Sequence, residues 1–293
     1  MKILVAAHSG FCYGVKRAVQ ILDELIEEHD ENHPVYTLGP IIHNKQVTEF
    51  YEERGVKVIE KLSVFDDNRR GGEKVVIRSH GAPKKVYDDA GKMQIEILDA
   101  TCPYVKKIQN TVSTYASKGY NIIIVGDSDH PEVIGIDGWC DHQATIVENI
   151  EDVEKLVESD APVCIVAQTT FNLTIWKDIT EILKKKFSNS VVHNTICLAT
   201  EQRQQACREL AEQVDCMIVI GGKHSSNTIK LANICSSVVK TIHIETKDEL
   251  DLSILRGDEV IGITAGASTP DWIVQSVILK IENEGEVYFD GKS

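Results

Sequence analysis

The chain has 293 residues, of which 42% are hydrophobic and 26% charged, and its formal net charge is −14 at pH 7. This length suffices for two or three domains, and the composition is typical of a soluble globular protein. The acidic balance argues against a nucleic-acid partner, which requires a basic surface. No run of about 18 apolar residues occurs, so we expect no membrane-spanning helix. Because Met1-Lys2 leads straight into a predicted strand without a signal peptide, we expect a cytoplasmic protein.

Strands and helices alternate along the chain. Apolar runs that predict strands lie within residues 2–7, 35–39, 75–81, 95–98, 122–126, 163–170, 191–192, 217–222 and 260–269. Helical periodicity is found at 15–26, 105–115, 207–214, 229–234 and 270–281. This alternation predicts an α/β protein with mainly parallel sheets, whose loops at the carboxyl ends of the strands form the site.

Three of the eight cysteines occupy equivalent positions, each between a strand end and the start of a predicted helix. They are Cys12, Cys102 and Cys197, which lie 90 and 95 residues apart along the chain. Basic residues follow each of them within the first turns of the helix, namely Lys16 and Arg17, Lys106 and Lys107, and Arg203. A helix N-terminus and nearby positive charge both favour a thiolate, so these positions suit chemistry.

The segments between these cysteines also repeat. In each, a strand ends in glycine and leads into a polar loop with a histidine, and a later strand ends in small polar residues at His80, Thr169 or Gly266. These three residues lie 68, 67 and 69 positions after their cysteines, so we interpret the chain as three copies of one α/β unit. The predicted domains are residues 1–98, 99–193 and 194–268, and the helix within 269–293 is expected to pack back on the first.

The other five cysteines are not expected to be ligands. No C-x-x-C pair occurs, and a cytosolic chain should not carry a disulfide framework. Cys164 and Cys216 lie within apolar strands and Cys207 on the apolar face of a helix, where a cysteine behaves as a small buried hydrophobe. The same interpretation is favoured for Cys140 and Cys235.

Several interpretations of the three equivalent thiols stay open on the residues alone. They could be unrelated buried side chains, although their repeated placement argues against this. They could hold zinc, although structural zinc usually takes ligands close together in sequence. A cubane iron–sulfur cluster suits ligands from three domains, because three thiolates leave one of its four irons free to act on a substrate oxygen.

The polar loops carry neutral and cationic donors, with few carboxylates, which favours an oxyanion ligand such as a diphosphate. Ser225, Ser226 and Asn227 precede an apolar helix, and there they could bind an anion or only cap the helix. Glu132, beside His130, is the candidate proton source, with Asp127 and Asp129 as competitors.

The motifs together resemble the 4-hydroxy-3-methylbut-2-enyl diphosphate reductases, the LytB/IspH family, over nearly the full chain. They are Gly10-Phe-Cys-Tyr-Gly-Val15, Gly39-Pro-Ile-Ile-His-Asn44, Arg78-Ser-His-Gly81, Ala100-Thr-Cys-Pro103, Gly126-Asp-Ser-Asp-His-Pro-Glu132, Gln168-Thr-Thr170, Ile196-Cys-Leu-Ala-Thr-Glu-Gln-Arg203, Ser225-Ser-Asn227 and Thr264-Ala-Gly-Ala-Ser-Thr-Pro270. The chain departs from the family at Tyr13, where a small residue is more usual, and at His224, where asparagine is.

The resemblance implies a trefoil of three pseudo-threefold-related α/β domains around a [4Fe–4S] cluster held by Cys12, Cys102 and Cys197. It implies reductive removal of the substrate's allylic hydroxyl with electrons from ferredoxin or flavodoxin, and Glu132 as proton donor. It also implies a substrate-binding set, which is His43, His80, His130, Thr169, Ser225, Ser226, Asn227 and Ser268. Two alternatives are an enzyme similar to quinolinate synthase and a non-catalytic iron–sulfur sensor.

Overall fold

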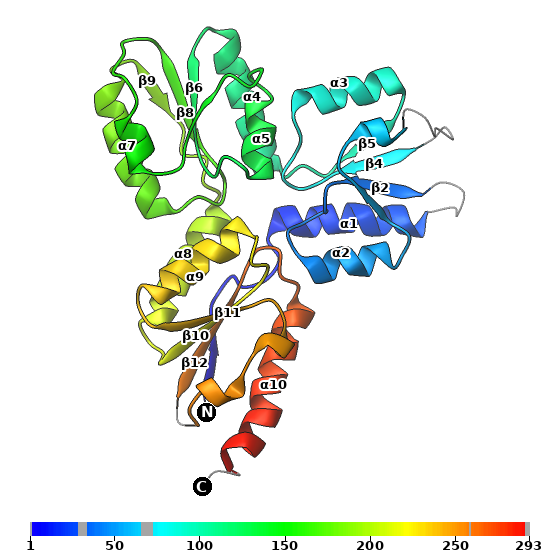
Figure 1. Ribbon diagram of the computed structural model, residues 1–293, viewed down its shortest axis with the longest axis vertical. Helices are drawn as coiled ribbons and strands as arrows, with labels where there is room; N and C mark the ends of the chain where they lie inside the picture. The colour runs from blue at the N-terminus through cyan, green and yellow to red at the C-terminus, as the bar shows by residue number, and fades with distance from the viewer. Residues whose placement is uncertain (1, 29–33, 66–72, 258, 291–293) are drawn as a thin grey trace. The chain divides into compact units, whose positions relative to one another are not determined.

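The computed structural model describes residues 2–28, 34–65, 73–257 and 259–290. Its strands form three four-stranded sheets in which every pair of neighbouring strands is parallel (Figure 1). This confirms the predicted α/β class with three parallel sheets. The chain divides into two compact units: unit 1 comprises Met1–Tyr13, His43–Val47 and Leu198–Ser293, and unit 2 comprises Gly14–Ile42 and Thr48–Cys197.

Unit 1 contains one sheet with helices on both faces. Its strand order is β1 (Lys2–Val5), β12 (Val260–Ala265), β10 (Cys216–Ile220) and β11 (Lys240–Ile244). Alternate residues of β10 point to opposite faces, as the two-residue period of a strand requires. Ile218 and Ile220 pack with the apolar side of α10 (Asp271–Asp290), whereas Met217 and Val219 pack with α8 (Leu198–Ala211) and α9 (Ser226–Ser236).

Unit 2 contains the other two sheets. One has the order β3 (Lys57–Ile59), β2 (Val35–Leu38), β4 (Lys74–Ile77), β5 (Glu96–Asp99), and the other β7 (Thr145–Val147), β6 (Asn121–Val125), β8 (Val163–Ala167), β9 (Ser190–Val192). The remaining α-helices of the chain are α1 (Tyr13–Glu27), α2 (Lys45–Glu52), α3 (Lys84–Met93), α4 (Pro103–Ser117), α5 (Pro131–Asp137), α6 (Ile150–Glu154) and α7 (Leu173–Lys186). Short 3-10 helices lie at Leu62–Phe65, Lys247–Glu249 and Leu252–Ile254.

The helix that begins after Cys102 illustrates why these segments are helical. Pro103 occupies the first turn of α4, where its fixed φ suits the helix and its missing N–H costs nothing. Ile108 and Val112 then repeat on one face and pack with Ile122 and Val166 of the β6–β8 sheet. The helix after the cysteine therefore covers the sheet formed by the chain that follows it.

The three sheets share one strand order when each is read from the strand that precedes a cysteine. In unit 1 this order is β1, β12, β10, β11, and in unit 2 it is β5, β4, β2, β3 and β9, β8, β6, β7. In unit 1 the strand that precedes the cysteine, β1, comes from the start of the chain, whereas the other three strands of that sheet come from its last third. The three sheets therefore repeat as the sequence indicated. The strand before Cys12, however, joins the sheet formed by the end of the chain and not the sheet of β2 to β5.

Two parts of the predicted domain arrangement need correction. The strand at the start of the chain was assigned to domain 1–98, but β1 pairs with β12, Lys2 opposite Val260 through Val5 opposite Ile263. The terminal helix packs on the sheet of β10 and β12, where both faces need apolar cover. From the predicted first domain, Ile3 of β1 packs against the same apolar cluster. Residues 291–293 of that predicted helix lie outside the described residues. The boundaries after residues 98 and 193 stay predictions.

No helix in the described part of the chain combines the length and the apolar character needed to cross a membrane.

Candidate functional site

Cys12, Cys102 and Cys197 are equivalent at the level of single hydrogen bonds. Each immediately precedes the first residue of a helix, α1, α4 or α8. Each also donates its backbone N–H to a carbonyl two residues beyond the end of the neighbouring strand β12, β4 or β8. These bonds are Cys12 to Ala267 (3.1 Å), Cys102 to Ser79 (2.9 Å) and Cys197 to Thr169 (3.1 Å). The backbone of all three cysteines is therefore fixed in the same way at the carboxyl end of a sheet.

Burial separates these three cysteines from the other five. Cys12, Cys102 and Cys197 are half-buried, whereas Cys164, Cys207 and Cys216 are fully buried in the apolar core, as predicted. Burial raises the pKa of the Cys164 thiol to about 12 and that of the Cys140 thiol to about 11. Burial therefore keeps these two thiols neutral.

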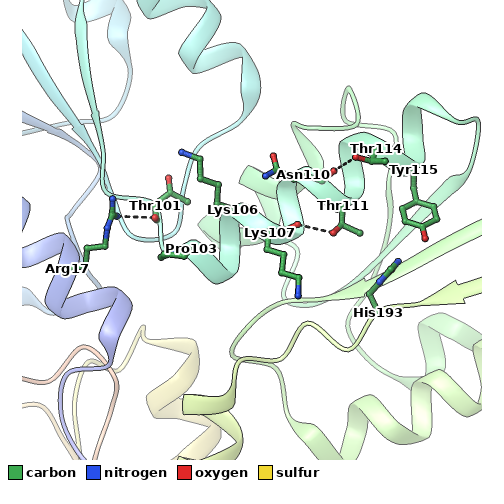
Figure 2. A pocket seen from close by; sticks show the side chains of 10 residues that line it. All are labelled: Arg17, Thr101, Pro103, Lys106, Lys107, Asn110, Thr111, Thr114, Tyr115 and His193. Atoms are coloured by element: carbon green, nitrogen blue, oxygen red, sulfur yellow. Dashed lines mark hydrogen bonds between the residues drawn. The ribbon is translucent and has the colours of Figure 1, made fainter.

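The surroundings of Cys102 are shaped by α1. A Cβ atom on Gly14 would lie 2.6 Å from the Cys102 sulfur, so only glycine leaves that sulfur its position. Gly14 is two residues after Cys12 in the chain. Arg17, one turn further along α1, donates to the carbonyls of Thr101 (3.2 Å) and Asp99 (3.3 Å), just before Cys102 (Figure 2). The start of α1 therefore supports the chain that carries Cys102.

A matching contact occurs in unit 1. Arg203 of α8 is only 5% exposed and donates to the carbonyl of Gly10 (2.6 Å), two residues before Cys12. In both cases the helix after one cysteine supplies an arginine to the segment before another. In two of the three repeats, a basic residue after the cysteine thus donates hydrogen bonds to backbone carbonyls.

In unit 2, Glu132 is linked to Cys197 through a single residue. Glu132 lies in the first turn of α5 and is 1% exposed. Its carboxylate accepts from the backbone N–H of Thr169 (2.6 Å) and from the Thr169 hydroxyl (2.7 Å). The carbonyl of the same Thr169 accepts the N–H of Cys197. A buried carboxylate is therefore held at a fixed position relative to a cysteine.

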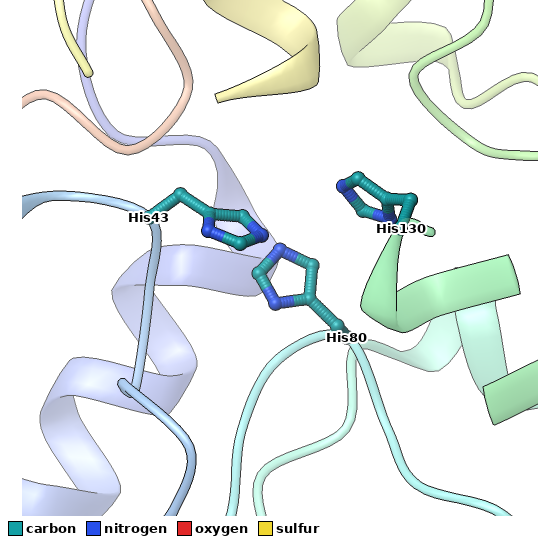
Figure 3. Close-up of side chains that lie close together, drawn as sticks. All are labelled: His43, His80 and His130. Atoms are coloured by element: carbon teal, nitrogen blue, oxygen red, sulfur yellow. The ribbon is translucent and has the colours of Figure 1, made fainter. Parts of the chain in front are cut away.

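Two histidines of unit 2, His80 and His130, are linked to the segment that carries Glu132. Nδ1 of His130 accepts the backbone N–H of Glu132 (3.1 Å), which caps α5 and leaves the proton of the neutral ring on Nε2. The ring of His80 meets that of His130 edge to face, with centroids 5.3 Å apart (Figure 3). His80 directly follows Ser79, whose carbonyl holds Cys102. His80 and the Glu132 carboxylate are thus tied to the ends of β4 and β8, which also hold Cys102 and Cys197.

In unit 1, the predicted anion-binding residues begin α9. Ser225 precedes the helix without capping it by its side chain, and Ser225, Ser226 and Asn227 are all buried. The side-chain nitrogen of Asn227 is buried and has no hydrogen-bond partner among the described residues. A buried amide donor without a partner at a helix N-terminus suits an anionic ligand.

The other two predicted residues of unit 1 lie against each other. The hydroxyl of Ser268 donates to the carbonyl of His43 (3.1 Å). A Cβ on Gly222 would come within 2.9 Å of that same carbonyl, so the loop before α9 also touches the residue. The His43 segment, the β12 end and the loop preceding Ser225 are therefore neighbours.

Two polar residues near these groups escaped prediction from the sequence. Gln168 is fully buried, accepts the N–H of Asp127 (2.9 Å) and donates to the Thr170 hydroxyl (2.9 Å), which fixes the loop that carries His130 and Glu132. Lys230 donates to the hydroxyl of Ser226 (2.8 Å), one helical turn before it. The i, i+4 spacing was the available signal for Lys230, whereas Gln168 was marked only as part of the motif Gln168-Thr-Thr170, without a role.

These features define a class of parallel α/β protein with three accessible cysteines at helix starts and polar loops at the carboxyl ends of its strands. The chain belongs to the family described as LytB protein, whose sequence model matches residues 3–282.

Relatives and solved structures agree with this assignment. A protein of Clostridioides difficile (strain 630), named 4-hydroxy-3-methylbut-2-enyl diphosphate reductase, is 47% identical over 97% of this chain and 100% of its own length. A protein of Thermoanaerobacter sp. (strain X514) with the same name is 51% identical over 96% of each chain. A solved structure titled as this reductase, "the Terminal Enzyme of the Non-Mevalonate Pathway", is 41% identical with a TM-score of 0.69 over 96% of this chain and 99% of that one. The structure of the Plasmodium falciparum reductase is 31% identical, with a TM-score of 0.89 over 96% of this chain and 88% of that one.

Proposed function

We propose that the protein is a 4-hydroxy-3-methylbut-2-enyl diphosphate reductase, which forms isopentenyl and dimethylallyl diphosphates at the end of the methylerythritol phosphate route. In this reaction the allylic C–O bond breaks, a C–H bond forms and water leaves, which consumes two electrons and two protons. The link from Glu132 through Thr169 to Cys197 carries the proposal, because it holds a proton-bearing group at a set distance from a thiol ligand.

Cys12, Cys102 and Cys197 would hold a [4Fe–4S] cluster. Their half-buried sulfurs, their identical backbone support and the absence of a side chain at position 14 fit such a group. When bound, the cluster supplies the electrons and one iron without a protein ligand, which can polarise the hydroxyl of the substrate.

A test of this fit is the replacement of Gly14 by alanine. The new Cβ would lie 2.6 Å from the Cys102 sulfur, which must then move although no ligand is removed. We expect reduced iron and sulfide content after anaerobic reconstitution, together with lower activity. Gly91→Ala in α3, where a Cβ meets nothing within 4 Å, is the matched control and should keep the full cluster. Full iron loading of the Gly14 variant would contradict the assignment of this space to the cluster.

The substrate's diphosphate would be bound by Ser225, Ser226, Asn227 and Ser268, together with His43, His80 and His130. Support comes from the α9 N-terminus, where the Ser225 side chain makes no capping hydrogen bond and the Asn227 side-chain nitrogen has no partner among the described residues. Backbone N–H groups and the helix dipole at this end favour phosphate oxygens. Lys230, which reaches Ser226, adds positive charge.

Asn227→Ala is expected to raise the KM for the allylic diphosphate. Loss of a hydrogen bond to a charged group costs about 1.5–3 kcal/mol, which corresponds to roughly 10- to 100-fold. Steady-state kinetics should show this increase with kcat changed much less. The control is Asn233→Ala, on the exposed side of the same helix, which should leave KM unchanged. An unaltered KM for the Asn227 variant would remove this amide from the diphosphate site.

Glu132 would deliver a proton to the reacting substrate. Its carboxyl group is buried, so water competes little for the proton, and Thr169 contacts both of its oxygens. The Thr169 hydroxyl can donate to the carboxylate or accept from the carboxylic acid, so the contact suits both states of the group.

The direct test uses anaerobically purified protein with its cluster intact. It is mixed with the allylic diphosphate and reduced methyl viologen, and the products are identified by chromatography. We expect isopentenyl and dimethylallyl diphosphates together with viologen oxidation. An intact cluster without any conversion would instead favour a non-catalytic iron–sulfur sensor.

A further inference from the structure

An open pocket lies on the outer side of α4 in unit 2 and is separate from the contacts of Glu132 and the histidines described above. Its volume is about 510 Å³, and Arg17, Lys106, Lys107 and His193 are among its lining residues (Figure 2). None of the described carboxylates lines it, although the chain has 45 acidic and 31 basic residues. A basic surface of this kind on a chain of net charge −14 is therefore a local exception.

The repetition of the fold explains why the pocket is here. Arg17 and Arg203 each follow a cysteine and donate to backbone carbonyls in the segment before another cysteine. The corresponding cation after Cys102 is Lys107, and the segment before Cys197 contributes His193. The ammonium group of Lys107 makes no hydrogen bond or ion pair with any residue that the structure describes. In this repeat the cation is thus left available to a partner.

The charges around the pocket sum to a positive value. Lys106 is compensated by Asp99, 2.6 Å away; burial opposes ionisation of Asp99, but hydrogen bonds from Lys106 and Thr101 lower its pKa. Among the residues that the structure describes, the charge of Arg17 meets only carbonyl oxygens and that of Lys107 meets no carboxylate. Burial and the nearby Lys107 lower the pKa of His193, so this ring is neutral. Two uncompensated positive charges remain.

The pocket adjoins the segments that carry the cysteines. Thr101 and Pro103, the neighbours of Cys102 in the chain, both line it. His193 stands four residues before Cys197, and Arg17 five residues after Cys12. Consecutive Cα atoms are about 3.8 Å apart, so the wall formed by Thr101 and Pro103 lies directly behind a proposed cluster ligand. A molecule bound here is close to the group that must receive electrons.

We propose that this basic pocket is the docking surface for an acidic electron-carrier protein. The inference rests on the proposed function, whose reaction consumes two electrons that an external donor must supply. Two one-electron carriers are oxidised for each allylic diphosphate reduced. The side chains of Arg17, Lys106 and Lys107 point in different directions around the pocket (Figure 2). A small oxyanion needs converging donors, whereas cations spread over an open surface suit the acidic face of a protein.

The test compares charge reversal at the pocket with the same change elsewhere. The pocket variants are Lys107→Glu and Lys107→Glu with Lys106→Gln. The controls are Lys184→Glu and Lys184→Glu with Lys185→Gln, exposed lysines of α7 that give the same net charge. Arg17 is left intact because it supports the chain before Cys102. The probe is a purified acidic [4Fe–4S] ferredoxin, and its binding to the holoenzyme is measured by calorimetry at low and moderate salt.

We expect the double pocket variant to bind ferredoxin roughly tenfold more weakly at low salt and to lose most of the salt dependence, because rim charges govern steering and its screening. The control variants should bind within twofold of the parent protein. Turnover with reduced methyl viologen, a small donor that needs no docking surface, should stay within twofold in every variant.

Three results would separate the possibilities. Normal viologen turnover with ferredoxin binding unchanged in the pocket variants overturns the docking proposal and leaves the proposed function standing. Loss of inorganic phosphate binding in equilibrium dialysis, with ferredoxin binding unchanged, makes the pocket a small-anion site and also overturns it. Weaker ferredoxin binding in a protein that converts no substrate with viologen supports the surface while rejecting the proposed function.

Discussion

Single replacement of Cys12, Cys102 or Cys197 by serine is expected to abolish both the cluster and the activity. Each cysteine has the same support, a backbone N–H bond to a carbonyl two residues past the neighbouring strand, so we expect all three to be needed as ligands of the proposed cluster. A serine hydroxyl is not a soft thiolate and binds iron–sulfur clusters poorly. Iron and acid-labile sulfide should fall to background after anaerobic purification, and reductase activity should fall with them.

The matched controls are cysteines of the core. Cys164→Ala and Cys216→Ala remove thiols that are fully buried, at a cost in stability of about 1 kcal/mol each for the small cavity. Both variants should keep the visible absorption of the cluster and its iron content. Full iron retention in all three serine variants would refute the ligand assignment, and loss of iron in the core variants would show that the measurement reports stability instead.

The sequence predicted the three parallel sheets because the relevant signals are local. An apolar run followed by a helical period specifies one strand and its crossover helix, and the same signal recurs after each cysteine. The partner of a strand is not a local property. The strand at 2–5 carries no mark that it pairs with β12, more than 250 residues later in the chain, since parallel strands are joined only through long crossovers. The terminal helix follows β12 and covers the same sheet, so its position could not be predicted either.

For the candidate site, too, the sequence predicted which residues matter but not how they contact one another. Equal spacing identified the three cysteines and placed Thr169 and His80 at corresponding strand ends, and Glu132 was predicted as the proton source in a loop at a strand end. The sequence could not show that one residue, Thr169, contacts both Glu132 and Cys197, since this depends on two hydrogen bonds across different loops. The sequence also placed basic residues after each cysteine, namely Lys16 and Arg17, Lys106 and Lys107, and Arg203. Only the structure shows that Arg17 and Arg203 donate to backbone carbonyls, whereas Lys107 lines the pocket without such a bond to any described residue.

Glu132→Gln is expected to slow turnover by about 10²-fold or more while leaving the cluster and substrate affinity intact. The amide has the shape of the carboxyl group, and its oxygen can still accept the Thr169 N–H. Its NH₂ group can donate to the Thr169 hydroxyl, which turns round to accept. The contact therefore survives, but an amide has no proton to release. Single-turnover kinetics with a prereduced enzyme should isolate this step from electron delivery.

Asp129→Asn is the control, because Asp129 is an exposed carboxylate in the same loop and a competing candidate for the proton role. It should retain the parent rate. Thr169→Val keeps the backbone N–H bond to Glu132 and removes only the hydroxyl bond, so we expect a smaller loss, roughly tenfold. If Glu132→Gln turned over at the parent rate while Asp129→Asn did not, the proton donor would be Asp129, and the link between Thr169 and Cys197 would serve only to hold the loop.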